Sequence, residues 1–197
     1  MNPKGYSMSL VMTGAPALEP VTLAAAKTHL RVDSALEDVF IASLITTSRV
    51  QVEAILGLAL ITQNWTWRFD AWRLGGVAFP LAPVSAVTSV RTQNSDLSYS
   101  ILAPAAYIVD GASTPPRLVP SRGNFPSPAV AAIGIEIQFT AGYGALAADV
   151  PAPLRQAILL LVAHWFENRE PLIEGAMPKS FPDAIIGLLE PYRVRRL

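Results

Sequence analysis

The sequence contains no cysteine, which excludes disulfides, thiolate metal sites and cysteine nucleophiles. It is also poor in charge, because only 15% of its 197 residues are charged, against about a quarter in an ordinary soluble protein. An apolar run at Ala157–Ala163 stops at His164, far short of the roughly 20 residues that a membrane-spanning helix needs. The first eight residues lack the apolar stretch of a signal peptide. We therefore expect a soluble protein with no membrane partner, made in a cytoplasm.

Apolar residues make up 51% of the chain, enough to bury a sizeable core. Combined with the low charge, this leaves two interpretations open: a compact monomer with an alanine-rich core, or a protein whose surface is partly covered by partners. Fifteen basic and fifteen acidic residues give a net formal charge of zero. Proteins that coat nucleic acid usually carry a basic excess, because phosphate neutralisation supplies most of their affinity. The balance argues against tight DNA binding, but not against a pore through which DNA passes.

Helical patterns begin the chain. Thr22 is predicted to cap a short helix, which a turn follows. A longer helix is predicted from Ser34, whose spacing from Glu37 fits a capping box. Gly57 suits the left-handed position at its end, so the two helices are predicted to form a hairpin.

Helical patterns also close the chain. A third helix is predicted to start after Pro151 and to stop before Pro171. A fourth is predicted from a cap at Ser180 to a stop at Pro191.

Between the helical ends the hydrophobic period changes to two. Trp65, Trp67 and Phe69 alternate with polar residues and predict a half-buried strand, and Ile133–Phe139 predicts another. Shorter strands, separated by turns rich in proline and glycine, are predicted at 77–81, 87–92, 99–102, 107–110 and 117–119.

These patterns predict an α+β fold, in which both chain ends form a helical bundle and a small antiparallel β module is inserted between them. The expected divisions are an N-terminal helical part at 1–61, a β-rich module at 62–143, a C-terminal helical part at 144–190 and an extended basic tail at 191–197.

Residues that usually carry catalysis are sparse. The only histidines, His29 and His164, belong to different predicted helices and form no H-x-x-x-H pattern. The sequence contains neither a G-x-S-x-G elbow nor a G-x-x-x-x-G-K-[ST] phosphate loop, and its acids are scattered. We expect no catalytic residue, no metal and no cofactor, and therefore a protein that is not an enzyme.

Candidate binding residues lie in the basic tail and at three single positions. The tail has three arginines among its last five residues, and it is either a frayed terminus or a peptide that docks on a partner. Trp72, placed on the opposite face from Trp65 and Trp67, is a possible interface residue, as are His164 and Arg169. The tail residues are Tyr192, Arg193, Val194, Arg195, Arg196 and Leu197.

Several blocks of sequence resemble the head–tail connector (adaptor) proteins of tailed phages. In chain order they are Pro20–Asp33, Glu37–Asp38 before an isoleucine-rich helix, Val52–Trp65, Phe139–Gly144, Val150–Ile158, His164–Glu170 and Leu188–Arg193. The blocks cover both ends of the chain, whereas the β-rich middle resembles the family poorly. The sequence is also similar to the connector of gene transfer agents, which are phage-like particles of bacteria.

The resemblance implies a structural protein that forms a homo-oligomeric ring of about twelve copies. Such a ring lies between the portal protein and a stopper or tail-completion protein, at the head–tail junction of a virion or phage-like particle assembled in the bacterial cytoplasm. It extends the channel through which DNA passes without specific binding. By position, residues 192–197 are the segment expected to reach the portal protein.

Two other functions remain open from the sequence. One is a carbohydrate- or peptide-binding module in which the β-rich part presents Trp72 and its loops. The other is a hydrolase with an unrecognised site, for which the two histidines are the most plausible bases.

Overall fold

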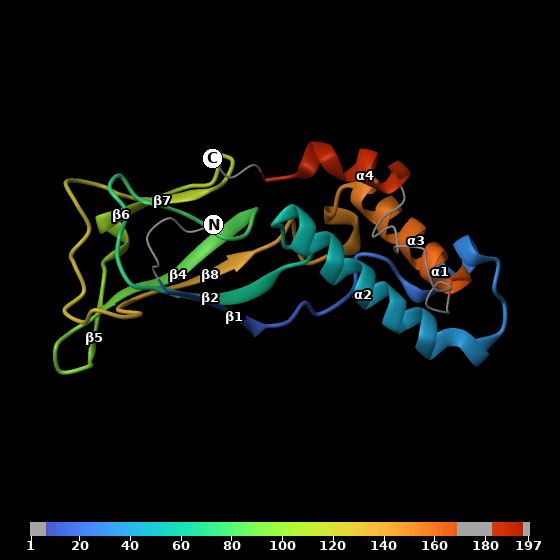
Figure 1. The fold of residues 1–197 in the computed structure, drawn as a ribbon, viewed down its shortest axis with the longest axis horizontal. Coiled ribbons are helices and arrows are strands. Elements are labelled where there is room, and N and C mark those ends of the chain that lie inside the picture. Colours follow the sequence, from blue (N-terminus) through green and yellow to red (C-terminus); the bar gives the residue numbers. More distant parts are fainter. Residues whose placement is uncertain (1–6, 169–182, 195–197) are drawn as a thin grey trace, which may run out of the picture. The chain divides into compact units, whose positions relative to one another are not determined.

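The computed structural model describes residues 7–168 and 183–194. These residues form two units (Figure 1), and each unit has buried apolar side chains of its own. The helical unit contains residues 17–61, 144–168 and 183–193, and the β unit contains 7–16, 62–143 and 194. The predicted α+β class is therefore confirmed, with a β-rich segment inserted between two helical segments.

The helical unit is built from four α-helices within the described residues. α2 packs against both α1 and α3, α1 also contacts α3, and α4 packs on α3. The helices are α1 (Leu23–Leu30), α2 (Asp38–Leu56), α3 (Ala152–Glu167) and α4 (Asp183–Leu189), with 3-10 turns η1 (Ala35–Glu37) before α2, η3 (Ala147–Asp149) before α3 and η4 (Glu190–Tyr192) after α4.

The predicted helix ends are mostly confirmed. The Thr22 hydroxyl accepts a hydrogen bond from the Ala25 amide at 3.1 Å, and Gly57 ends α2 with a φ of 70°. The predicted capping box is corrected: the Ser34 hydroxyl accepts from the Leu36 amide and caps the 3-10 turn η1, so that α2 starts only at Asp38. The predicted cap at Ser180 and the stop at Pro171 lie outside the described residues.

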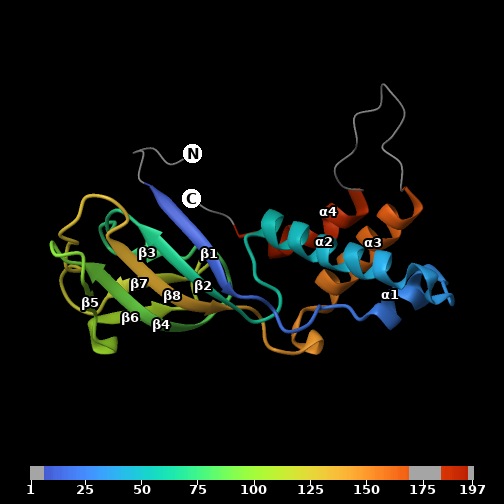
Figure 2. The same ribbon diagram turned by 90° about the horizontal axis from the view of Figure 1, so that it is seen from below.

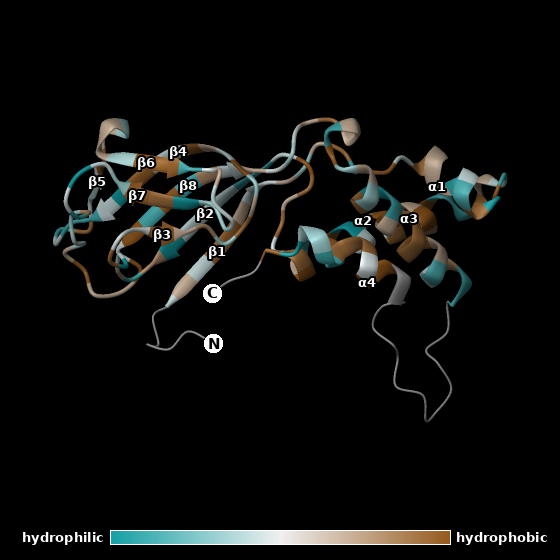
Figure 3. Ribbon diagram, turned by 90° about the horizontal axis from the view of Figure 1, so that it is seen from above, coloured by the Kyte–Doolittle hydropathy of each residue, from teal (hydrophilic) through white to brown (hydrophobic). Residues whose placement is uncertain are grey.

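The core of the helical unit lies between α2 and α3. Both helices contribute fully buried aliphatic side chains at helical spacing, and apolar colour runs along α3 in Figure 3. These side chains are Ile41, Ile45, Val52, Leu56, Leu154, Ile158, Leu161 and Val162.

The β unit contains two antiparallel sheets (Figure 2). The larger has the strand order β1-β2-β8-β4-β5, and the smaller has the order β3-β7-β6. The strands are β1 (Met8–Gly14), β2 (Gln63–Phe69), β3 (Val77–Ala78), β4 (Val84–Gln93), β5 (Tyr99–Ile101), β6 (Tyr107–Asp110), β7 (Arg117–Pro120) and β8 (Ile135–Ala141), with the 3-10 turn η2 (Pro104–Ala106) before β6.

One strand was not predicted. The sequence assigned all of 1–61 to the helical part, but β1 pairs antiparallel with β2, with Leu10 opposite Trp67 and Met12 opposite Trp65. The segment Met8–Gly14 lacks a clear polar–apolar alternation, so its strand conformation is set by pairing with a distant part of the chain.

The alternation seen in the sequence selects the core of the β unit. Trp67 and Ile137 are paired neighbours in the large sheet, and both are buried. Phe79, which follows β3, lies with its ring centroid 6.1 Å from that of Trp67 and 5.1 Å from that of Phe139. Trp67 is thus a core residue, as its place on the apolar side of the alternation indicates, while Trp65 on the same side is only half-buried.

Candidate interaction surfaces

The predicted docking tail is described only in its first half. Tyr192 ends η4, and Arg193 follows in extended conformation, while Arg195, Arg196 and Leu197 lie outside the described residues. Arg193 and Glu190 form a loose, exposed ion pair at 3.9 Å, a kind of pair that contributes little to stability. Docking of this segment on a partner stays a prediction.

Trp72 is engaged inside the β unit. Its ring stacks on Phe125 with centroids 4.0 Å apart and meets the edge of Phe69 at 5.4 Å. Its indole N–H donates to the carbonyl oxygen of Pro126 at 2.9 Å. Because one ring face is covered by Phe125, the side chain ties the loop before β8 to the end of β2, and it offers a poor platform for a sugar ring.

His164 lies near the end of α3 and is half-exposed. Its backbone carbonyl accepts hydrogen bonds from the Asn168 amide at 3.1 Å and from Asn168 Nδ2 at 2.7 Å, which close the helix. Arg169 lies outside the described residues. The interface roles of His164 and Arg169 stay predictions.

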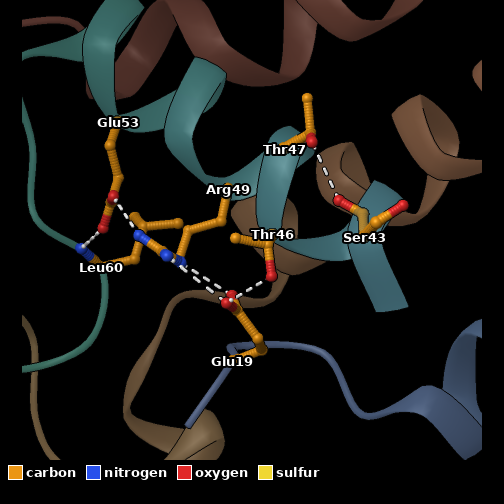
Figure 4. A network of polar contacts seen from close by, with 7 residues as sticks. All are labelled: Glu19, Ser43, Thr46, Thr47, Arg49, Glu53 and Leu60. Carbon is orange, nitrogen blue, oxygen red and sulfur yellow. Dashed lines mark hydrogen bonds and ion pairs between the residues drawn. The ribbon is translucent and has the colours of Figure 1, made fainter. Parts of the chain in front are cut away.

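A buried arginine organises the helical unit, and sequence analysis did not single it out. Arg49 of α2 is only 5% exposed, and its guanidinium lies between the carboxylates of Glu19 and Glu53, each at 2.7 Å (Figure 4). The Thr46 hydroxyl donates to Glu19 at 2.9 Å, and Glu53 accepts from the Leu60 amide at 2.8 Å. The network therefore fixes α2 to the segment before α1 and to the chain that leaves α2.

The charge of Arg49 is secured by its two partners. Burial lowers the pKa of the guanidinium, but the hydrogen bond that it donates to Glu19 and the charge of Glu53 outweigh burial and hold the pKa above its ordinary value. A buried charge is tolerated only when it is paired in this way, so the network stabilises the shape of the unit.

A second buried charge lies at the centre of the large sheet. Glu136 of β8 stands in register with Arg68 of β2 and Arg91 of β4. Its carboxylate is 0% exposed and accepts from Arg68 Nε at 2.7 Å, from Arg91 Nε at 2.8 Å and from Gln138 Nε2 at 3.1 Å. The Arg91 guanidinium also lies 4.5 Å from the centroid of the Tyr99 ring.

This arrangement sets the ionisation of Glu136. Burial raises the pKa of its carboxyl group, but the hydrogen bonds from Arg68 and Arg91 outweigh burial and leave the pKa below its ordinary value. The group is a carboxylate at neutral pH, neutralised by two cations. Its geometry is that of a clasp across three strands, β2, β8 and β4.

Metal-binding side chains do not gather in the described part of the chain. Among residues 7–168 and 183–194, no three His, Asp or Glu side chains lie together in a way that could hold a metal ion.

The exposed side of α2 is the most unusual surface of the helical unit. Between residues 39 and 55 every exposed side chain is uncharged, and the turn before it exposes Leu36. Val39 is 85% exposed and Val50 is 49% exposed. The hydrophobic spacing of the sequence predicts this helix but not its exposed uncharged side, because exposure depends on which side the other helices cover. The exposed residues are Val39, Ala42, Ser43, Thr46, Thr47, Val50, Gln51, Ala54 and Ile55, here called the α2 face.

By length and composition alone, the stretch Ala35–Leu56 could cross a membrane, and only 39% of its most apolar part is buried within the chain. Core helices of ordinary proteins pass the same test. This helix differs from such a core helix because most of its apolar part is not buried within the chain.

Comparison with solved structures places the fold among particle components. No protein-family model matches the sequence, and no curated protein matches it. One similar chain lies in the neck of an empty gene transfer agent (GTA) particle, in a structure computed with C6 symmetry. Its sequence is 28% identical to this one, and the two chains superpose with a TM-score of 0.80 over 96% of this chain and 97% of that one.

Two further structures agree. A chain in the virion of a native gene transfer agent (GTA) particle is 28% identical with a TM-score of 0.79, over 95% of this chain and 96% of that one. A chain in the neck of a native GTA particle, computed with C12 symmetry, is 27% identical with a TM-score of 0.70, over 95% and 97%. The chain is thus similar over nearly its whole length to neck and virion components of a gene transfer agent particle.

Proposed function

We propose that this protein is a structural component of the neck of a gene transfer agent or a related phage-like particle, at the head–tail junction. The single observation that carries the proposal is the extent of the likeness. The shared fold covers 96% of this chain and 97% of the neck chain with a TM-score of 0.80, so both units are shared. Agreement over two units with separate cores is much stronger support than a common single domain.

In this proposal the protein acts as a connector (adaptor) that forms a closed ring. The likeness to chains from necks computed with C6 and C12 symmetry supports a ring of about twelve copies, joined by one repeated head-to-tail contact. Its neighbours are the portal protein on one side and a stopper or tail-completion protein on the other. The segment Tyr192–Leu197 is proposed to dock on the portal protein, as extended terminal peptides do in other assemblies.

The charge balance of the chain is compatible with a ring that surrounds a channel for DNA. The chain has zero net formal charge, and the arginines Arg49, Arg68 and Arg91 are paired with carboxylates. A wall with little basic excess gives DNA phosphates few cations to bind, so DNA can slide through.

Deletion of the gene in a strain that produces the particle tests this function. We expect DNA-filled heads that lack tails in electron micrographs, and recovery of tailed particles when the intact gene is supplied in trans. Normal tailed particles in the deletion strain would contradict the proposal.

A further inference from the structure

We propose that the α2 face packs against a second copy of this chain in the assembled particle. The inference rests on the proposed neck function and adds to it the surface that joins neighbouring subunits.

The composition of the α2 face differs from that of an ordinary solvent-exposed helix surface. Solvent-facing sides of helices in soluble proteins are normally rich in Glu, Lys and Arg. Here nine exposed positions from Val39 to Ile55 carry no charge, and Leu36 just before them is 95% exposed. The two charged side chains within this stretch, Arg49 and Glu53, point inward to the network shared with Glu19.

Lipid is a poor occupant for this face. Arg49 lies in the middle of α2 and is paired with Glu19, a residue outside the helix. The other side of α2 packs on α1 and α3. Insertion into a bilayer would have to take this charge network into hydrocarbon or strip α2 from its bundle, and either costs several kcal/mol.

Nucleic acid is also a poor occupant. A surface that binds phosphates supplies Lys or Arg side chains, and the α2 face has none.

A second copy offers a surface that matches. The exposed residues within α1 are Ala24, Ala25, Thr28 and His29, of which the first three are small and none is Asp, Glu, Lys or Arg. Exposed Val39 and Val50 would meet no opposing charge there, and small side chains let two helices approach closely. Two different helix faces that expose no Asp, Glu, Lys or Arg suit a head-to-tail contact, because such a contact joins unlike surfaces of neighbouring copies.

Site-specific crosslinking tests the inference. The photoreactive residue p-benzoylphenylalanine replaces Val50, and purified particles containing this chain are irradiated. We expect a crosslinked dimer of this chain, identified by mass spectrometry. The same substituted chain, irradiated alone at high dilution, serves as the control and should give no dimer.

A matched pair of substitutions provides an independent measurement. Val50→Asp introduces a carboxylate that would be buried without a partner between copies, whereas Val50→Thr keeps the size and stays uncharged. We expect about tenfold or greater loss of Val50→Asp from particles, and retention of Val50→Thr. Both variants should keep the thermal midpoint of the isolated chain, because Val50 is half-exposed there.

The outcomes separate the two proposals. A crosslink from position 50 to another neck polypeptide or to lipid, no crosslink at all, or equal incorporation of both variants would overturn the inference and leave the neck function standing. Absence of the wild-type chain from purified particles would overturn the neck function, and the inference with it.

Discussion

At the scale of single residues, the two buried charges explain how a chain so poor in charge uses its few ionic groups. Arg49 and Glu136 are each held between two groups of opposite charge. Removing one member of such a set leaves a buried charge without its partner. This destabilises the fold far more than replacing the whole set with apolar side chains would. These residues therefore help to define the shape of the two units.

The Glu136 clasp predicts a dependence of stability on pH. Its pKa in the folded protein lies below the ordinary value of 4.5, so its stabilising contribution is complete above that value and is lost as pH falls through the lower, folded-state pKa. Glu136→Gln should lower the free energy of unfolding by about 1–3 kcal/mol at neutral pH, because Arg68 and Arg91 lose their charge partner. The difference between the two proteins should shrink with acidification.

Urea denaturation from about pH 7 to about pH 3 measures this difference, because protonation of carboxylates paired in the native state is what drives acid denaturation. The exposed residue Glu167 supplies the control, since Glu167→Gln should leave the curve close to wild type throughout. A constant gap between wild type and Glu136→Gln over the whole range would contradict the role assigned to the clasp.

Sequence reasoning reached some of these residues and not others. Thr22 and Gly57 were predictable because caps depend on local backbone geometry. The partners of Glu136 were not, because Arg68 and Arg91 meet it only through the register of three strands. Trp72 was predicted only as a possible interface residue, and its stacking on Phe125 was not predictable because it depends on how a distant loop folds back.

At the scale of elements, neighbouring glycines in the turn between β2 and β3 differ in what they permit. Gly75 has a φ of 79° with open space around a prospective Cβ atom. Gly76 has a φ of 114°, and a Cβ there would lie 2.8 Å from Val119 Cγ1 and even closer to the Leu118 carbonyl oxygen. The backbone of this turn thus packs directly on β7.

This pair predicts unequal costs for the same substitution. Gly75→Ala should lower the free energy of unfolding by about 1 kcal/mol, the strain of a left-handed alanine. Gly76→Ala should lower it by about 3 kcal/mol or more, because strain is added to a clash with backbone. Denaturant titration of the two variants side by side measures the difference, and equal losses would contradict the packing of this turn on β7.

Helices and strands were predicted correctly where burial of one face of the element sets the hydrophobic pattern of its sequence. The alternation around Trp67 and the helical spacing in α2 and α3 were visible because each element buries one side. β1 was missed because it is an edge strand with exposed Met8, Val11 and Met12, so burial imposes little pattern on it. The bare α2 face was missed because sequence periodicity shows which side is apolar, not whether anything covers it.

At the scale of the whole molecule, the change of hydrophobic period near residue 62 predicts where the strands begin, and β2 starts at Gln63. The return to helical spacing after Pro151 likewise matches α3. Composition alone did not predict the proposed function. The proposal began with a resemblance carried by both ends of the chain, and the likeness to gene transfer agent structures now extends over the β unit, where that resemblance was poor.

The most direct test of the neck proposal is a cryo-electron microscopy reconstruction of purified particles from the producing strain. The proposal predicts a closed ring of copies of this chain in the neck, about twelve in number, with both units fitted to density. Neck density that excludes this chain, together with its absence from the particle by mass spectrometry, would contradict the proposal.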